Sequence, residues 1–212
     1  LLEAYSRPRQ NGVNAIALRE GDGVIQVRLT NGNNEVIIAN RNGRAIRFHE
    51  SKVRVMGRVA AGVRGMTLDG DDDEVVGMIC IKHPEHETVL VVSEQGYGKR
   101  SAIDDYRVTN RGGKGIKTIQ VTEKTGKLVG IKNVTEDNDL MIINKSGITI
   151  RMKVADLNVI GRATQGVRLI NLEKRNDEIA SVCKVVSESE EDRIGGVEES
   201  ADEAPNTPTD NA

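Results

Sequence analysis

The chain has 212 residues, a formal net charge of −2 and only 2% aromatic residues. A chain of this length can bury a substantial core, so disulfides or structural metals are not needed to stabilise it. No stretch approaches the roughly 18 apolar residues of a membrane-spanning helix, and no signal peptide is visible. We therefore expect a cytoplasmic protein with no membrane partner, in which Cys80 and Cys183 are free, buried thiols.

The charge is unevenly divided along the chain. From Ser187 onward, nine acidic residues are opposed by Arg193 alone, which leaves 29 basic and 23 acidic residues before that point. A basic body with an acidic tail favours a polyanionic partner and a tail that competes with it. The alternative is a tail that only improves solubility. In either case residues 187–212, with two prolines and few apolar side chains, are expected to be disordered.

The body repeats itself about every fifty residues. Four segments share one pattern around the aligned glycines Gly12, Gly62, Gly115 and Gly166, which are separated by 50, 53 and 51 residues. A second pattern, Gly-x-x-x-Arg, recurs in phase at Gly43/Arg47, Gly96/Arg100 and Gly147/Arg151. Two motifs with one period indicate a repeat array, in which each unit buries its apolar face only against its neighbours.

The first unit contains four predicted strands. Residues 13–18 form a short apolar segment, and residues 24–30 alternate with period two, as a strand with one buried face does. Asn31-Gly32-Asn33 favours a hairpin turn because its residues accept positive φ. Two further strands follow at residues 36–39 and 44–48. Four short strands joined by glycine turns predict one antiparallel sheet per unit.

The later units agree with this pattern. Residues 89–93 and 140–144 occupy the third-strand position, residues 99–103 and 148–152 the fourth, and residues 178–186 form the last strand. The predicted fold is all-β: a propeller-like β-pinwheel of four-stranded antiparallel blades over residues 1–186, with units beginning near 7, 58, 111 and 162. Leu1–Tyr5 matches the end of a unit and the fourth unit stops after its second strand, so we expect a partial array whose first blades are missing.

No catalytic or metal site is predicted. His83 and His86 lie in a loop between two predicted strands without a third ligand cluster. The segment Asp69–Asp73 lacks the Glu spacing of a calcium loop. Arg111–Gly115 resembles a phosphate-binding loop only in composition, because Gly115 stands where Ser or Thr would follow the lysine.

The repeated basic residues are the candidate binding site. One set lies four residues before each aligned glycine, and a second lies two residues after it. A third lies on the fourth strand next to residues such as Ile46 and Ile150, which should turn it toward the wetter face. Spread over successive blades, these side chains would follow a phosphate backbone. The predicted DNA-binding residues are Arg7, Arg9, Arg47, Arg58, Arg64, Lys99, Arg100, Arg111, Lys114, Lys117, Arg151, Arg162 and Arg168.

Two structural alternatives stay open. Arg64 shares strand parity with Met66 and Leu68, so the residues after each glycine could instead lie inside and pair with Asp104 or Asp156. The glycines of Arg111–Gly115 could expose backbone N–H groups to a phosphate, or could merely form the turn that enters a blade. The scarcity of aromatic residues argues against base stacking and favours double-stranded over single-stranded nucleic acid.

Four motifs together carry a family resemblance: residues 6–9, 57–66, 95–101 and 159–167. They closely resemble the C-terminal DNA-wrapping domains of bacterial DNA gyrase A, within the type IIA topoisomerases, over residues 1–186. The family's diagnostic Gln-Arg-Arg-Gly-Gly-Lys-Gly box is expected in the first blade. Residues 110–115 are similar to it but lie in a later repeat, so they are interpreted as a paralogous blade motif.

The resemblance implies a six-bladed pinwheel that wraps double-stranded DNA without sequence specificity and supports ATP-dependent negative supercoiling. It also implies partners, namely the rest of gyrase A together with gyrase B, in a heterotetramer with two copies of each that is associated with the bacterial nucleoid. ATP and Mg²⁺ would act in other domains, and no catalytic residue falls in this chain. The alternatives are the topoisomerase IV equivalent, which selects DNA geometry, and a propeller that binds a protein partner.

Overall fold

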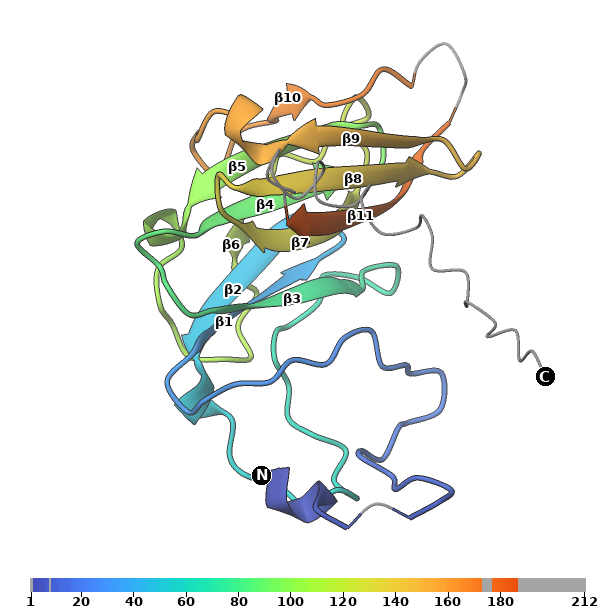
Figure 1. The fold of residues 1–212 in the computed structure, drawn as a ribbon, viewed down its shortest axis with the longest axis vertical. Coiled ribbons are helices and arrows are strands. Elements are labelled where there is room, and N and C mark those ends of the chain that lie inside the picture. Colours follow the sequence, from blue (N-terminus) through green and yellow to red (C-terminus); the bar gives the residue numbers. More distant parts are fainter. Residues whose placement is uncertain (1, 8, 173–176, 187–212) are drawn as a thin grey trace, which may run out of the picture.

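A computed structural model describes residues 2–7, 9–172 and 177–186 (Figure 1). These residues form an all-β structure whose helical elements are short 3₁₀ turns, none of them long enough to span a membrane. The strands are β1 (Glu35–Asn40), β2 (Arg44–His49), β3 (Val75–Ile81), β4 (Thr88–Ser93), β5 (Tyr97–Ala102), β6 (Ile116–Lys117), β7 (Leu128–Val134), β8 (Asn138–Asn144), β9 (Thr149–Lys153), β10 (Val167–Arg168) and β11 (Ile179–Val186). The 3₁₀ turns are η1 (Leu2–Tyr5), η2 (Glu50–Lys52), η3 (Ile103–Asp105) and η4 (Val154–Asp156).

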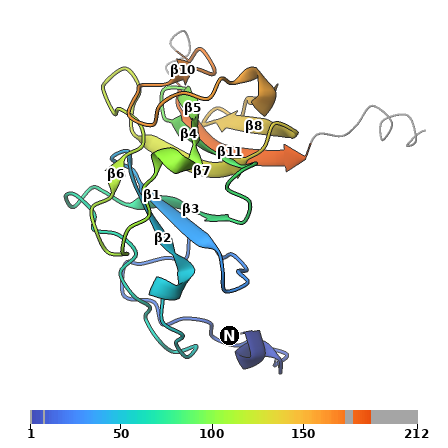
Figure 2. The same cartoon turned by 90° about the vertical axis from the view of Figure 1, so that its left-hand side faces the viewer.

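The strands form three antiparallel sheets: the first lies lower in the view of Figure 1, and the second and third lie above it at similar heights (Figures 1 and 2). The first sheet has the order β3-β1-β2-β6, the second β10-β5-β4-β7 and the third β11-β8-β9. The predicted all-β fold with repeated antiparallel blades is therefore confirmed. The six predicted hairpin strands and the last strand all exist, with bounds within two residues of those expected.

The composition of each blade differs from the prediction. Four strands of one unit do not make a sheet; instead, a hairpin takes a third strand from the next unit and a fourth from the unit after that. The hairpin β1–β2 thus pairs with β3 and with β6, which lies more than sixty residues downstream. The hairpin β4–β5 repeats this arrangement with β7 and β10. Successive units are consequently tied together by backbone hydrogen bonds as well as by packing.

This exchange explains why two predicted strands are wrong. Residues 13–18 and 24–30 have strand-like sequences, yet they form no strand and are largely exposed, with Val27 77% accessible. In the exchanged arrangement such segments pair with hairpins of earlier units. Within the described residues no hairpin precedes β1, so these segments have no strand on which to pair, and a strand without a ladder partner is not stable in water.

The core lies between the sheets. Val89 and Val91 of β4 pack against the first sheet in a cluster that includes Ile37 and Ile131, while Leu90 and Val92 pack toward the third sheet. Both faces of β4 are therefore covered, which explains its continuous apolar sequence. All four of these β4 residues are completely inaccessible to solvent.

Charged residues of opposite sign connect the hairpin turns. Equivalent turn positions carry Arg41, Glu94 and Lys145 in the three blades, and Arg41 donates to Glu94 of the next blade at 2.7 Å. In the first and third blades the residue before the third strand is acidic: Glu74 pairs with Arg41, and Glu178 pairs with Lys145. In the middle blade the turn residue itself, Glu94, is acidic. The turns of the first and middle blades therefore carry opposite charges where the two blades meet.

The exchange also requires a glycine at each junction. Gly115 has φ +73°, and a Cβ there would lie 2.4 Å from the carbonyl oxygen of Ala45. A Cβ at Gly166 would lie 2.5 Å from the Gly98 carbonyl oxygen, whereas Gly62 has φ +89° but no atom of the described residues within 4 Å of this position. The aligned glycines are thus turn-forming, as predicted, and two of them also allow strand pairing.

We predict that Gly115→Ala lowers the free energy of unfolding by about 3 kcal/mol or more, because left-handed backbone strain adds to a backbone clash. Gly62→Ala is the matched control and should cost only about 1–2 kcal/mol of left-handed strain. Urea denaturation monitored by circular dichroism measures both variants. Equal destabilisation would contradict the close approach at Gly115.

Candidate nucleic-acid interface

Of the segments that carry the first two sets of basic residues, those from Arg111 to Lys117 and from Arg162 to Arg168 lie along one edge of the first two sheets, whereas Arg7, Arg9 and Arg58 lie in segments that form no strand. The short strands β6 and β10 join the free sides of β2 and β5, opposite the edges occupied by β3 and β7. Arg7, Arg9, Arg64, Lys114, Lys117 and Arg168 are exposed, and Arg58, Arg111 and Arg162 are partly exposed. This group of nine side chains is called the edge cations below.

Two of the edge cations make the same contacts one repeat apart. Arg111 donates from Nε to the carbonyl of Lys52 at 2.9 Å and from Nη1 to the carbonyl of Arg64 at 3.0 Å. Arg162 donates to the carbonyls of Asp105 and Lys117, at 2.9 and 2.7 Å. Each guanidinium is therefore held by neutral backbone groups, and no carboxylate of the described residues forms an ion pair with it.

These contacts connect the edge cations of neighbouring units. Arg111 lies on the backbone of Arg64, and Arg162 lies on the backbone of Lys117, so the basic residues follow one another from unit to unit. The adjoining loop contributes to the same seam: the Gly112 N–H donates to Gly65 O at 2.6 Å, and the Thr67 N–H donates to Gly113 O at 2.9 Å. The N–H of Gly112 is thus used within the fold.

The predicted positions of Arg47 and Arg100 are wrong. Arg47 is 8% exposed, forms an ion pair with Glu35, and donates through Nη1 to the carbonyls of Ile103 and Tyr106 at 2.8 and 2.9 Å. Arg100 is 5% exposed and pairs with Glu136 at 3.1 Å. The fourth strand faces the following unit on that side, so Arg47 and Arg100 enter a blade boundary instead of facing solvent.

Arg151 occupies the equivalent place in the third sheet. Its Nε donates to Asp139 at 2.6 Å, and its side chain is 38% exposed. Asp139 aligns with Glu35, whereas the second sheet has Thr88 at this position. Arg100 accordingly lacks the carboxylate at that position which the other two arginines have, and its Nε and Nη1 are buried without a hydrogen-bond partner among the described residues.

Lys99 is another predicted DNA-binding residue that the structure buries. The side chain is 1% exposed, and Nζ donates to the carbonyls of Gly161, at 2.7 Å, and Arg162, and contacts the Thr164 hydroxyl. Burial lowers the pKa of Lys99 to about 8, the Asp105 carboxylate acting in the opposite direction. Lys99 therefore holds the loop that carries Arg162 and cannot itself reach a ligand.

The basic residues two positions after each aligned glycine lie in different environments. Arg64 is exposed, and Asp104 lies 4.0 Å from Arg47 instead. Arg168 donates to the hydroxyl of Tyr97 at 3.0 Å, and both Arg168 and Lys124 lie over the Tyr97 ring. The sequence does not predict this role for Lys124 or Tyr97, because nothing in their spacing follows the repeat.

The remaining motifs are structural. Asp73 is buried and accepts from the Asn42 and Asp69 N–H groups at 3.1 and 2.9 Å, so the acidic segment shapes its own loop. His83 and His86 lie in the β3–β4 turn, as predicted, and no group of three or more metal-ligating side chains occurs among the described residues. Cys80 is buried and free, but Cys183 is exposed, contrary to expectation. The predicted acidic tail lies outside the described residues.

In the comparison with known proteins, each of the last three matched segments contains one hairpin and the third strand that pairs with it. The family model described as the DNA gyrase C-terminal domain, a β-propeller, matches residues 1–31, 34–82, 87–135 and 138–183. DNA gyrase A of Staphylococcus aureus is 47% identical over 199 residues, which cover 94% of this chain and 22% of that protein. The chain thus spans about a fifth of the length of the curated relatives that it matches.

Two solved structures have the same fold. The C-terminal domain of DNA topoisomerase IV gives a TM-score of 0.82 at 25% identity, covering 92% of this chain and 60% of the other. A DNA gyrase A C-terminal domain gives a TM-score of 0.74 at 29% identity, covering 84% and 59%.

Burial of the Lys99 amine predicts a specific pH dependence of the protein's stability. The unfolded chain has Lys99 at its ordinary pKa of 10.5, whereas the folded pKa is about 8. Between these values the unfolded state binds more protons, so this residue's contribution to stability should rise from pH 8 to pH 10.5. Urea unfolding of the wild type and of Lys99→Met at about pH 8 and about pH 10 measures how the contribution of Lys99 to the free energy of unfolding changes with pH. A stability difference that stays constant or moves against Lys99 as the pH rises would contradict the burial.

Proposed function

Because this chain belongs to the family of DNA gyrase C-terminal β-propeller domains, we propose that it binds double-stranded DNA through the edge cations and wraps the duplex along that edge. The observation that carries the proposal is the contact of Arg111 with the Arg64 carbonyl and of Arg162 with the Lys117 carbonyl. These two contacts connect cations of successive units without neutralising them. Cations presented in this way would contact the phosphate backbone of DNA, so binding would not depend on the base sequence.

The placement of the aromatic residues supports a duplex ligand. Phe48, Tyr97 and Tyr106 are all buried, and Tyr5, at 38%, is the exposed aromatic side chain. Binding of single strands depends largely on bases stacked on accessible rings. A curved edge would instead bend a duplex at an elastic cost of about 1–6 kcal/mol for 20–30 base pairs, and many phosphate contacts are needed to offset that cost.

Within a whole protein, such wrapping would support ATP-dependent negative supercoiling by a type II topoisomerase. The partners would be the rest of gyrase A and gyrase B, two copies of each, in the bacterial cytoplasm at the nucleoid. ATP and Mg²⁺ would act in those other domains. The present chain would contribute DNA geometry and no reacting group.

A second candidate is the function of the topoisomerase IV equivalent, which selects DNA geometry rather than wrapping strongly. The higher TM-score with that domain favours it, whereas the much higher sequence identity with gyrase A favours wrapping. The two candidates differ in what they do to the topology of a closed circle.

We expect the triple variant Arg58→Ala, Arg111→Ala, Arg162→Ala to bind duplex DNA more weakly while remaining folded. If each arginine contacts one phosphate, the slope of log affinity against log salt should become less steep by about 3, since each contact contributes roughly 0.9. Fluorescence anisotropy at several salt concentrations measures this.

The matched control removes the same charge elsewhere. Lys82 follows β3, Lys132 lies on β7 and Lys184 on β11, the edges opposite the edge cations. Replacing these three with alanine should leave the slope nearly unchanged. Equal losses in both triple variants would show that net charge, and not the edge, determines binding. A flat salt response of the wild type would instead favour the protein-binding module.

Ligation of a nicked circle separates the two topoisomerase functions. A wrapping domain should shift the linking number of the closed product in one direction, in proportion to the protein bound. Agarose electrophoresis with an intercalator resolves the topoisomers. An unshifted distribution at saturating protein would favour the topoisomerase IV type of function.

A further inference from the structure

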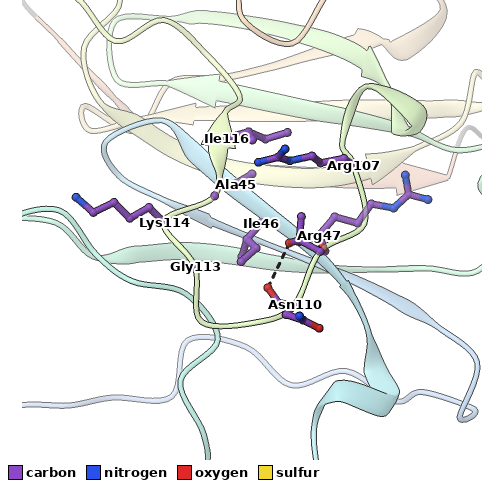
Figure 3. A pocket seen from close by; sticks show the side chains of 10 residues that line it. Ala45, Ile46, Arg47, Arg107, Asn110, Gly113, Lys114 and Ile116 are labelled. Carbon is purple, nitrogen blue, oxygen red and sulfur yellow. Dashed lines mark hydrogen bonds between the residues drawn. The ribbon is translucent and has the colours of Figure 1, made fainter.

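A pocket lies between β2 and the loop that precedes β6 (Figure 3). Its volume is about 200 Å³, and its wall includes Ile46 and Arg47 of β2 together with Arg107, Asn110, Gly113 and Lys114 of the loop. Figure 3 shows Arg107 and Lys114 on the same chain segment, on either side of Ile46. The pocket lies beside Arg111, on the edge assigned above to DNA.

The lining is electropositive. Among the described residues, it contains three cationic side chains and no carboxylate. Two of these cations have acidic partners outside the lining: Arg47 pairs with Glu35, and Lys114 with Asp69 at 3.1 Å, in an exposed contact that solvent screens. Arg107 is exposed and has no acidic partner among the described residues.

The glycines of the loop open the pocket to a ligand. Gly113 lines it and presents no side chain, so an anion could approach its backbone and that of Lys114 closely, whereas the side-chain position of Gly115 is taken by the Ala45 carbonyl. The single proton of the Thr109 hydroxyl is shared between two carbonyls of the pocket wall, those of Arg47 at 3.1 Å and Asn110 at 3.2 Å. Cationic side chains and accessible backbone around one small space are typical of a phosphate-binding site.

The next repeat shows what closes such a space. Lys99 aligns with Ile46, because Gly98 pairs with Val167 as Ala45 pairs with Ile116. There the lysine amine is inserted under the loop and donates to the carbonyls of Gly161 and Arg162. The short apolar side chain of Ile46 makes no such bonds, so the equivalent space under residues 110–115 stays open.

We propose that the pocket under residues 110–115 binds a phosphate group, with Arg107, Lys114 and the backbone N–H groups of residues 113–115 as donors. This inference rests on the proposed function in that a duplex would supply the phosphate, and it adds Arg107 to the edge. It also makes the units unequal, because the loop carrying Arg162 is filled by Lys99. A free phosphate anion has the same chemistry and is the second source.

The test is an NMR titration of the ¹⁵N-labelled full chain, first with inorganic phosphate and then with a short duplex. Phosphate should shift the amide signals of Gly113, Lys114 and Gly115 in a saturable manner. The amides of residues 164–166 are the internal control and should stay unmoved. Shifts spread equally over both loops would overturn the proposal, as an adventitious surface effect.

Ile46→Lys is the decisive variant, because it reproduces the arrangement of the second repeat. It adds a positive charge near the site, so general electrostatic attraction would strengthen phosphate binding, whereas a filled pocket should weaken it at least tenfold. Ile46→Met, which lengthens the apolar side chain without charge, should weaken it less and covers the case that the lysine variant does not fold. Unchanged or tighter binding in the folded variants contradicts the proposal.

The duplex arm separates this inference from the proposed function. Duplex shifts at residues 113–115 that compete with phosphate identify the DNA backbone as the source. Phosphate shifts without any duplex binding would leave the pocket supported and refute DNA binding. Duplex binding that never moves these amides would refute the pocket as part of the DNA edge and leave the edge cations in place.

Discussion

The pairing of each short strand with a hairpin two units earlier is the contact on which the rest of this structure depends. The β2–β6 and β5–β10 ladders are only two residues long, yet each draws a whole unit across a blade boundary. This crossing is possible because Gly115 and Gly166 let two backbones approach more closely than a Cβ would permit. It also places Arg111 on the backbone of Arg64, and Arg162 on that of Lys117, which produces the line of edge cations.

The same repeat therefore gives two populations of basic residues with different roles. Arginines on the fourth strand enter the boundary with the following unit, where Arg47 bonds a carboxylate and two backbone carbonyls. Arginines four residues before the glycines remain at least partly exposed, and Arg111 and Arg162 donate to backbone carbonyls. These hydrogen bonds of Arg47 link neighbouring units, so the first group contributes to the cohesion of the blades. The second group keeps its charge available to a polyanion.

The repeats are similar in backbone and unequal in chemistry. The middle blade exchanges the signs of its turn residues, replaces Ile46 by Lys99 and has Thr88 where its neighbours have a carboxylate. The first change sets opposite charges against each other at a blade boundary. The second closes a space that is open in the preceding unit. Differences of this kind would let an array of nearly identical units present a graded surface to a regular ligand such as duplex DNA.

The sequence by itself determined the repeat, its period, the all-β class and the hairpins, because these follow from local alternation and from turn glycines. It also determined which basic residues recur. Only the tertiary structure decided which hairpin each short strand joins, and so why residues 13–18 and 24–30 form no strands. It decided as well that Lys99, Arg47 and Arg100 are buried while Arg111 is not. The alternation of residues along a strand predicts on which face of the sheet a side chain lies. What covers that face depends on units more than fifty residues away.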